Sequence, residues 1–195
     1  FAIQQYEKAL SGDEQEKADL ARYKISLVYL QKGEFSRAFD LLMEVVQKNQ
    51  DRNPELKDEA LVASVWPFTE ATPEDLRKRP EMHSPVSFYR RLSSDKNSYR
   101  RVLAKLARRF ELKKRDADAM KVWTELMRVS DDVNERSEAL ESFYVISKKL
   151  KTEFYDRETI NEVVKSLWMI RSEETNDVIV KKTYKKYEPL LRDLV

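Results

Sequence analysis

The side chains with the widest catalytic range are scarce in this chain of 195 residues. It has one histidine, His83, between Pro80 and Pro85, and no cysteine. A nucleophilic triad or a zinc site therefore lacks its usual parts. Two isolated glycines cannot form a glycine-rich phosphate loop. Aspartate and glutamate are abundant, but none stands in an apolar context that would raise a carboxyl pKa. We therefore expect no catalytic residues, no metal and no cofactor.

The positive charge is concentrated in one segment. From Leu76 to Arg115 there are fourteen basic residues and three acidic ones, a net charge of +11, whereas the whole chain carries only +2 and the rest therefore carries −9. Such asymmetry produces a local positive field that favours an anionic partner. Three interpretations remain open: a solvated face paired with acidic neighbouring helices, a contact with a protein or carboxylate ligand, and a contact with nucleic acid or anionic lipid.

The middle of the basic segment has the clearest helical pattern. Between Ser98 and Asp131, one apolar face of a first helix is followed by a charged turn and a second apolar face. The first face carries Leu103, Leu106, Ala107 and Phe110, and the second carries Ala119 and Trp123. Asp116 is predicted to cap the second helix at its N-terminus. The pattern predicts two antiparallel helices in close contact.

These residues resemble the signature of the tetratricopeptide repeat. A second copy upstream has Ile25, Ser26 and Tyr29 in its first helix, Gly33 in the turn, and Ala38 and Leu42 in its second helix. Arg22 stands where the family has a large apolar residue. A third partial copy is Ala2, Tyr6, Ala9 and Leu10, and Ala2 lies 36 positions before Ala38. The resemblance implies an all-α, right-handed superhelical solenoid of antiparallel helix pairs.

The composition agrees with thin helical layers. The charged fraction is 37%, the hydrophobic fraction is 41%, and two glycines are too few for a turn-rich β-protein. No apolar stretch reaches the roughly 18 residues that predict a membrane span. Because the chain begins inside a repeat, we interpret it as a fragment of a longer protein.

The helix pattern predicts four segments within a single solenoid: N-terminal repeats in 1–65, an irregular insertion with one or two short helices in 66–94, the best-matching repeat in 95–131, and degenerate repeats with a C-terminal cap in 132–195. Trp66-Pro67 is predicted to end a helix that starts at Pro54. The three tryptophans are predicted to pack in helix stripes or at helix ends. The helices expected are Phe1–Leu10, Glu14–Lys32, Glu34–Lys48, Pro54 to about Val65, Asp95–Leu112, Asp116–Val129, Val133–Leu150, Arg157–Ile170 and Glu173–Leu194.

The resemblance also implies a binding groove, because the first helix of each pair lines the concave face in this family. The positions carried over to this groove are Tyr23, Lys24, Leu27, Gln31, Arg101, Lys105 and Arg108. Some members bind a C-terminal carboxylate with a polar clamp, in which Tyr23 and Leu27 here replace a lysine and an asparagine. That departure argues against chaperone-tail binding and favours an extended peptide or a partner helix. The alternative is a groove filled by the chain's own segments.

The function predicted is a protein–protein interaction scaffold or adaptor, with a protein or peptide partner that can be acidic. The segments Leu61–Phe68 and Tyr99–Arg109 resemble large envelope-associated repeat proteins of gliding or predatory δ-proteobacteria. That resemblance implies a motility or envelope complex and a periplasmic location, with the cytoplasm as the alternative. The alternative function is a polyanion- or nucleic-acid-binding helical module that uses the basic residues of 76–115.

Overall fold

The computed structural model describes residues 15–150 and 157–172, and within them every regular element is a helix. This confirms the all-α prediction. In chain order the elements are α2 (Gln15–Gln31), α3 (Phe35–Lys48), α4 (Pro54–Thr69), α5 (Pro73–Lys78), the 3-10 helix η1 (Pro80–His83), α6 (Pro85–Leu92), α7 (Lys96–Leu112), α8 (Asp116–Val129), α9 (Val133–Leu150) and α10 (Arg157–Ser172). The helices expected at Phe1–Leu10 and Glu173–Leu194 lie outside the described residues.

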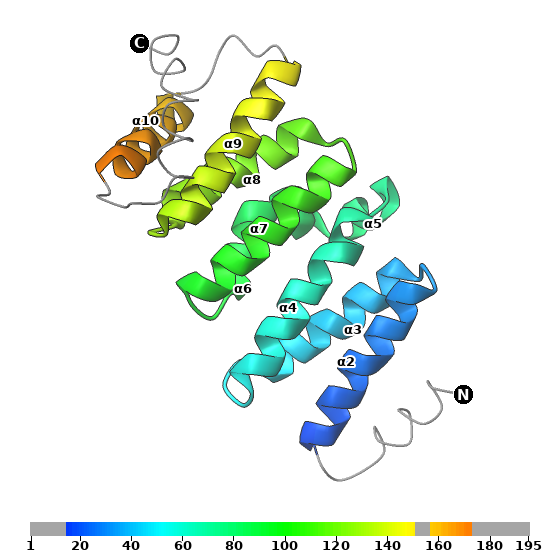
Figure 1. Cartoon of the computed structure of the whole chain (residues 1–195). Helices are drawn as coiled ribbons and strands as arrows, with labels where there is room; N and C mark the ends of the chain where they lie inside the picture. The colour runs from blue at the N-terminus through cyan, green and yellow to red at the C-terminus, as the bar shows by residue number, and fades with distance from the viewer. Residues whose placement is uncertain (1–14, 151–156, 173–195) are drawn as a thin grey trace. The chain divides into compact units, whose positions relative to one another are not determined.

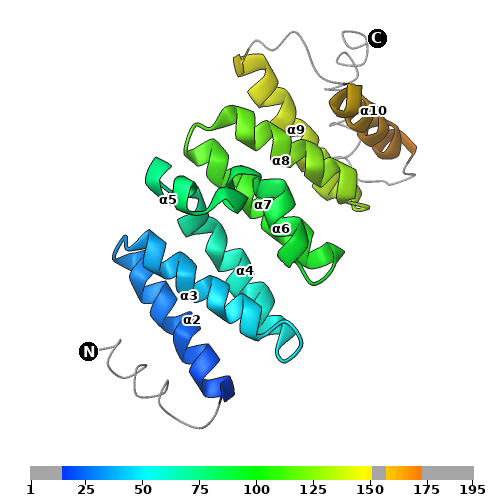
Figure 2. The ribbon, with the colours of Figure 1, turned by 180° about the vertical axis from the view of Figure 1, so that it is seen from behind.

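The chain forms two compact units, residues 1–109 and 110–195, so the division falls near the end of α7. In the first unit α3 packs against both α2 and α4. Figure 1 shows α2, α4 and α7 on one face of this unit, and Figure 2 shows α3 and α6 on the opposite face. The first unit therefore has two helical layers. The four-segment organisation expected from the sequence remains a prediction.

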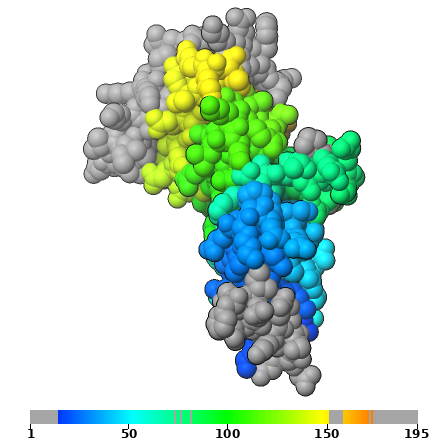
Figure 3. Space-filling model, turned by 90° about the vertical axis from the view of Figure 1, so that its right-hand side faces the viewer, coloured from blue at the N-terminus to red at the C-terminus, as the bar shows by residue number. Residues whose placement is uncertain are grey.

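A cluster of aromatic rings fixes α6 against the other helices of the first unit. Phe39, Phe68, Phe88 and Tyr89 are buried, and neighbouring rings of this cluster have centroids 5.0 to 6.2 Å apart. The Tyr89 hydroxyl lies 3.1 Å from the Ser64 hydroxyl. In Figure 3 the α5–α6 segment, coloured teal to green, stands out beside α2. Within the connection between α4 and α7, α6 is thus anchored to α3 and α4 by aromatic packing.

The predicted helix end at Trp66-Pro67 is wrong, because α4 continues through Pro67 to Thr69. Phe68 is buried in the aromatic cluster, so tertiary packing holds this last turn in helical form. The Thr69 hydroxyl donates a hydrogen bond of 2.9 Å to the Trp66 carbonyl. Packing at the end of the helix therefore outweighs the local conformational preference of a residue before proline.

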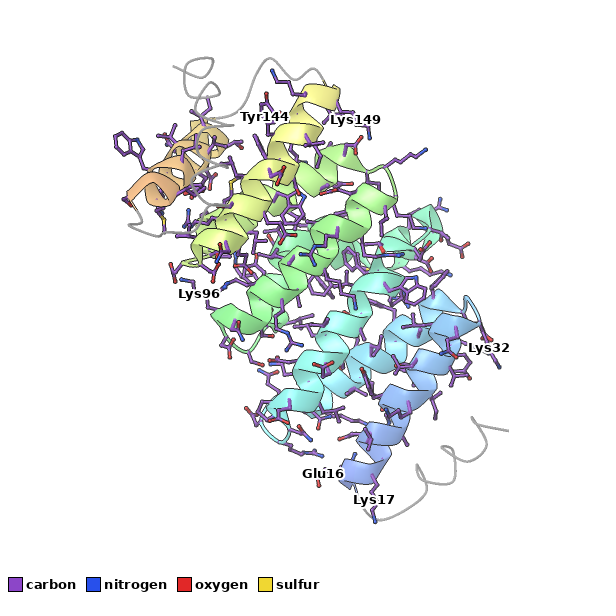
Figure 4. All side chains as sticks on the ribbon, in the orientation of Figure 1. Glu16, Lys17, Lys32, Lys96, Tyr144 and Lys149 are labelled. Atoms are coloured by element: carbon purple, nitrogen blue, oxygen red, sulfur yellow. The ribbon has the colours of Figure 1, made fainter. Side chains whose placement is uncertain are left out.

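Among the described residues of the second unit, α8, α9 and α10 pack against one another around Trp123, Leu140, Phe143 and Leu167. Asp116 does not cap α8, which corrects the prediction. It is the first helical residue, and its carboxylate instead forms an ion pair with the Lys149 ammonium on α9, at 2.5 Å. Figure 4 labels Lys149 near the end of α9.

Two turns have the same geometry. Gly33 follows α2 with φ +75°, and Lys114 follows α7 with φ +57°. In both turns the backbone N–H of the residue with positive φ donates to the carbonyl three residues back. The N–H of the following residue donates to the carbonyl five residues before its own position, and all four bonds are 2.9 to 3.1 Å long. This pattern caps a helix C-terminus and favours glycine. Lys114 adopts the left-handed conformation without being glycine, so the turn is made in the same way at both places.

Candidate partner-binding pocket

A pocket of about 270 Å³ opens between α2, α4 and α7 in the first unit. Helix α2 contributes two turns of one face, α4 contributes a second face, and α7 contributes one lysine. The lining residues are Tyr23, Leu27, Leu30, Gln31, Glu59, Val62, Ala63, Trp66 and Lys105. All of them belong to α2, α4 and α7, the helices that Figure 1 shows on one face of the unit.

The apolar part of the pocket has a buried floor and a partly exposed wall. Leu30 and Ala63 are buried, and Leu27, Val62 and Tyr23 are half-buried. Such a surface binds an apolar side chain by removing both from water. The floor therefore offers a surface on which an apolar side chain could be buried without any contribution from charge.

Trp66 forms the exposed rim of the pocket, with 40% of its surface accessible. Phe35 lies on it with ring centroids 6.4 Å apart, and the Arg109 guanidinium lies 5.5 Å from its ring centre. Arg109 is fixed in turn by Glu70 at 2.6 Å and by the Thr69 hydroxyl at 3.2 Å. The indole is thus held in position by the fold itself, so a ligand at this rim would not have to order it.

Lys105 supplies the positive charge of the pocket. It is half-buried, and burial lowers the pKa of its ammonium, with the positive charge of Arg109 acting in the same direction and Glu59 opposing both. Glu59 forms a 2.8 Å ion pair with Arg101 rather than with Lys105. Across residues 15–150 and 157–172, no group lies within hydrogen-bonding distance of the Lys105 ammonium. The three donors of this lysine are therefore available in the pocket.

Tyr23 provides a neutral hydroxyl on the α2 side. Burial raises the pKa of its phenol, and the negative charge of Glu59 raises it further. The phenol therefore stays protonated at neutral pH and remains a hydrogen-bond donor. The Lys24 ammonium lies 5.8 Å from the Tyr23 ring centre, outside the pocket.

The structure brings four of the seven predicted groove residues into one pocket: Tyr23, Leu27, Gln31 and Lys105. Lys24 and Arg101 flank it, each through a contact with a lining residue. Arg108 is exposed on α7 and does not line the pocket.

The sequence analysis missed the α4 side of the pocket. Glu59, Val62, Ala63 and Trp66 have the i, i+3, i+4, i+7 spacing of one helix face, which is the available signal. Helix α4 is also apolar on its other faces, because it packs on α3 as well as on α2, so no single face stood out.

Two of the three tryptophans differ from the prediction. Trp123 is 1% exposed, as expected of a packed residue. Trp66 and Trp168 are 40% and 57% exposed, so the prediction of core packing is wrong for both. Trp66 lines the pocket, and Trp168 lies on the exposed face of α10, so no helix covers either ring completely.

Many cations of the basic segment are paired with acids. In chain order, the pairs are Lys78 with Glu74, Arg79 with Asp40 and Asp75, Arg101 with Glu59, Arg109 with Glu70, and Arg115 with Asp118. These pairs neutralise part of the charge that the sequence concentrates between Leu76 and Arg115. They agree with the first of the three interpretations, a basic face that pairs with acidic neighbours.

A second cavity of about 290 Å³ lies beside the α2–α3 turn and is lined mainly by polar residues. Its carboxylates already have partners: Glu34 pairs with Arg37, Glu70 with Arg109, and Asp75 accepts from Thr72. The three carboxylates that line this cavity are thus already engaged within the fold.

Neither a metal site nor a membrane span is found in the part of the chain that the structure describes. No group of three or more histidine, aspartate or glutamate side chains is placed there to hold a metal ion. His83 is exposed at the end of η1. No helix there has both the length and the apolar character required to cross a bilayer.

Comparison with known proteins gives no family assignment. No protein-family model matches the chain, and no curated protein or solved structure is significantly similar to it.

Proposed function

We propose that the chain is a helical-repeat interaction module that binds an extended peptide segment of a partner protein across α2, α4 and α7. The observation that carries this proposal is the convergence of Tyr23, Leu27, Gln31 and Lys105 with Trp66 around one open pocket. The pocket combines an apolar floor, two aromatic rings and few polar groups, a combination typical of ligand sites. With such a peptide-binding module, the chain would act as a scaffold or adaptor within a larger protein.

We propose further that the helix pairs form a tetratricopeptide-like, right-handed superhelix. The support is local: α2 and α7 end in turns of the same hydrogen-bonding pattern, and each is followed within a few residues by another helix, α3 and α8. The first helices of successive pairs, α2, α4 and α7, contribute the pocket residues. A repeat array brings equivalent faces together in this way.

Polyanion binding by residues 76–115 is the weaker candidate. Lys78, Arg79, Arg101, Arg109 and Arg115 are engaged by carboxylates, which lowers the field available to a phosphate backbone. A non-enzymatic role, and the envelope or periplasmic location with the cytoplasm as its alternative, remain predictions from the sequence.

The test is selection of peptides from a random dodecapeptide library displayed on phage. The immobilised chain is expected to enrich a related set of peptides. Leu27→Asp places a charge on the apolar wall and is expected to abolish that enrichment, whereas Trp168→Ala, which removes an exposed tryptophan of the second unit, is expected to leave it intact.

Photo-crosslinking locates the contact. A benzoylphenylalanine at position 31, on the pocket, is expected to crosslink to a selected peptide, and the same group at position 112, which is 73% exposed and outside the pocket, is expected to give no crosslink. Absence of any enriched peptide, or crosslinking from position 112 alone, contradicts the proposal.

A further inference from the structure

Lys105 is the one lining residue with a full positive charge, and its donors are not used by the described part of the chain. Withdrawing a cation from water without a partner is costly. Two other cations of α7 do have partners within the fold. Arg101 forms an ion pair with Glu59 at 2.8 Å, and Arg109 forms one with Glu70 at 2.6 Å. The pocket therefore leaves one cation for an external anion.

We propose that Lys105 receives the side-chain carboxylate of an aspartate or glutamate within the partner's peptide, next to an apolar side chain that packs against Trp66 and Leu27. This inference rests on the proposed function and specifies its ligand. The apolar side chain and the carboxylate must be close in the peptide, since Lys105 and Trp66 line the same pocket of about 270 Å³.

The charges around the pocket favour an anion. Arg109 and Arg101 lie beside it, and the two carboxylates nearest to them, Glu70 and Glu59, are the partners of these arginines. A positively charged ligand group would be repelled by Lys105, and no carboxylate without an arginine partner would offset that repulsion. A carboxylate at Lys105 forms a charge-assisted hydrogen bond, which offsets the free-energy cost of removing the ammonium from water.

The polar groups of the lining favour a side-chain carboxylate over the end of a chain. Besides Lys105, the lining offers two uncharged donors, the Tyr23 hydroxyl and the Gln31 amide, and the negative Glu59. A terminal carboxylate is usually held by several converging donors in a polar nest. Here the floor and wall are largely apolar, formed by Leu30, Ala63, Leu27 and Val62. The apolar surface therefore suits the middle of a peptide chain, and one ammonium fixes the register of that chain.

The deciding experiment is a charge-swap selection. The library is fused to the phage coat through the C-terminus of each peptide, so no terminal carboxylate is available. The wild-type chain is expected to enrich peptides with an acidic residue at one fixed position beside an apolar residue. Lys105→Glu is expected to enrich lysine or arginine at that same position, because the sign of the pocket charge is reversed.

Lys24→Glu is the matched control. It makes the same change of charge on the neighbouring helix, where the ammonium lies outside the pocket, and should still select an acidic residue. Circular dichroism and urea unfolding confirm that each variant is folded.

A titration measures the pair directly. The acetylated, amidated consensus peptide is expected to bind the wild-type chain about tenfold or more tightly than a peptide with the acidic residue replaced by its amide. On Lys105→Met the two peptides should bind equally.

The outcomes separate the two proposals. If wild-type chain enriches no peptide, the proposed function and this inference both fall. If peptides are enriched without a fixed acidic position, or if Lys105→Glu selects the same acidic position, the pocket binds peptides but Lys105 is not its anion site. If binding requires a free C-terminal carboxylate in synthetic peptides, the side-chain assignment is overturned.

Discussion

Lys105 in the first unit and Arg136 in the second are both cations withdrawn from water, and they are satisfied differently. Arg136 is 2% exposed; its Nε donates to the Ser130 carbonyl at 2.5 Å and its Nη1 donates to the Ser166 hydroxyl at 3.1 Å. Burial lowers the pKa of Arg136, with Glu162 and Asp131 opposing the shift. Lys105 has a pKa lowered by the same cause but no such acceptor.

The difference shows that burial alone does not identify a ligand-binding cation. Arg136 joins the start of α9 to α10 and to the preceding loop, so its charge serves the fold. Lys105 faces a pocket with its donors available, which is why we propose a role in recognition for its charge instead. Four substitutions test this contrast, from the largest expected effect to the smallest.

Arg136→Ala is expected to destabilise the second unit by about 3 kcal/mol, because it leaves the buried Ser130 carbonyl and Ser166 hydroxyl without their donor. Amide hydrogen exchange of α9 and α10 should accelerate. Arg136→Lys keeps the charge but lacks the forked donors, and should recover only part of the loss. Unchanged exchange in Arg136→Ala would show that these bonds do not hold α10 in place.

Arg109→Ala is expected to cost about 1 to 2 kcal/mol in urea unfolding. It removes a partly buried ion pair with Glu70, a hydrogen bond to Thr69 and the contact with the Trp66 ring. Because the indole then loses its support, peptide binding should weaken as well. Wild-type stability in this variant contradicts the assignment of Arg109 to the support of Trp66.

Arg101→Ala is expected to lower the free energy of unfolding by about 0.5 kcal/mol. Its pair with Glu59 is about half exposed on both sides, and exposed pairs contribute little. The loss should shrink further in high salt, which screens exposed charges. A loss as large as that of Arg109→Ala would remove the distinction drawn between the two arginines.

Lys105→Met should leave stability unchanged at neutral pH, or raise it slightly, because no partner is lost. The lowered pKa of Lys105 also determines in which direction the free energy of unfolding changes with pH. Native Lys105 releases its proton below the ordinary pKa of 10.5, so between the native pKa and 10.5 the unfolded chain binds more protons and wild-type stability rises with pH. Lys105→Met lacks this rise.

The comparison is made in a Tyr23→Phe background. Native Tyr23 keeps its proton above the ordinary pKa of 10.0, so its contribution falls as pH rises through that value and opposes the lysine effect. Urea unfolding at neutral pH and at a pH approaching 10.5 gives the difference. Parallel pH profiles of the two chains would mean that the fold does not perturb Lys105.

Much of the local structure could be predicted from hydrophobic periodicity. The bounds of α8 and α9 agree with those predicted, because apolar stripes and charged turns mark their ends. The end of α4 could not be predicted, since Phe68 is held by rings from α3 and α6 that are distant in sequence. The exposure of Trp66 has the same origin: a stripe residue is buried only where another helix covers it.

The candidate site was only partly accessible from the sequence. The resemblance to a repeat indicated the α2 and α7 faces that supply Leu27 and Lys105. It did not indicate α4, whose apolar residues point to several neighbours at once. Nor could composition show which cations of the basic segment meet a carboxylate; Arg101, Lys105 and Arg109 share one helix and differ only in what lies opposite them.

Pro67 has one more effect on the pocket. Proline has no N–H, so the carbonyl oxygen of Ala63, four residues earlier, lacks the donor that the regular helix pattern supplies. Ala63 is itself a floor residue of the pocket. Pro67 therefore removes one backbone hydrogen bond of α4 directly beside the pocket, and the last turn of this helix depends on the aromatic packing of Phe68 in its place.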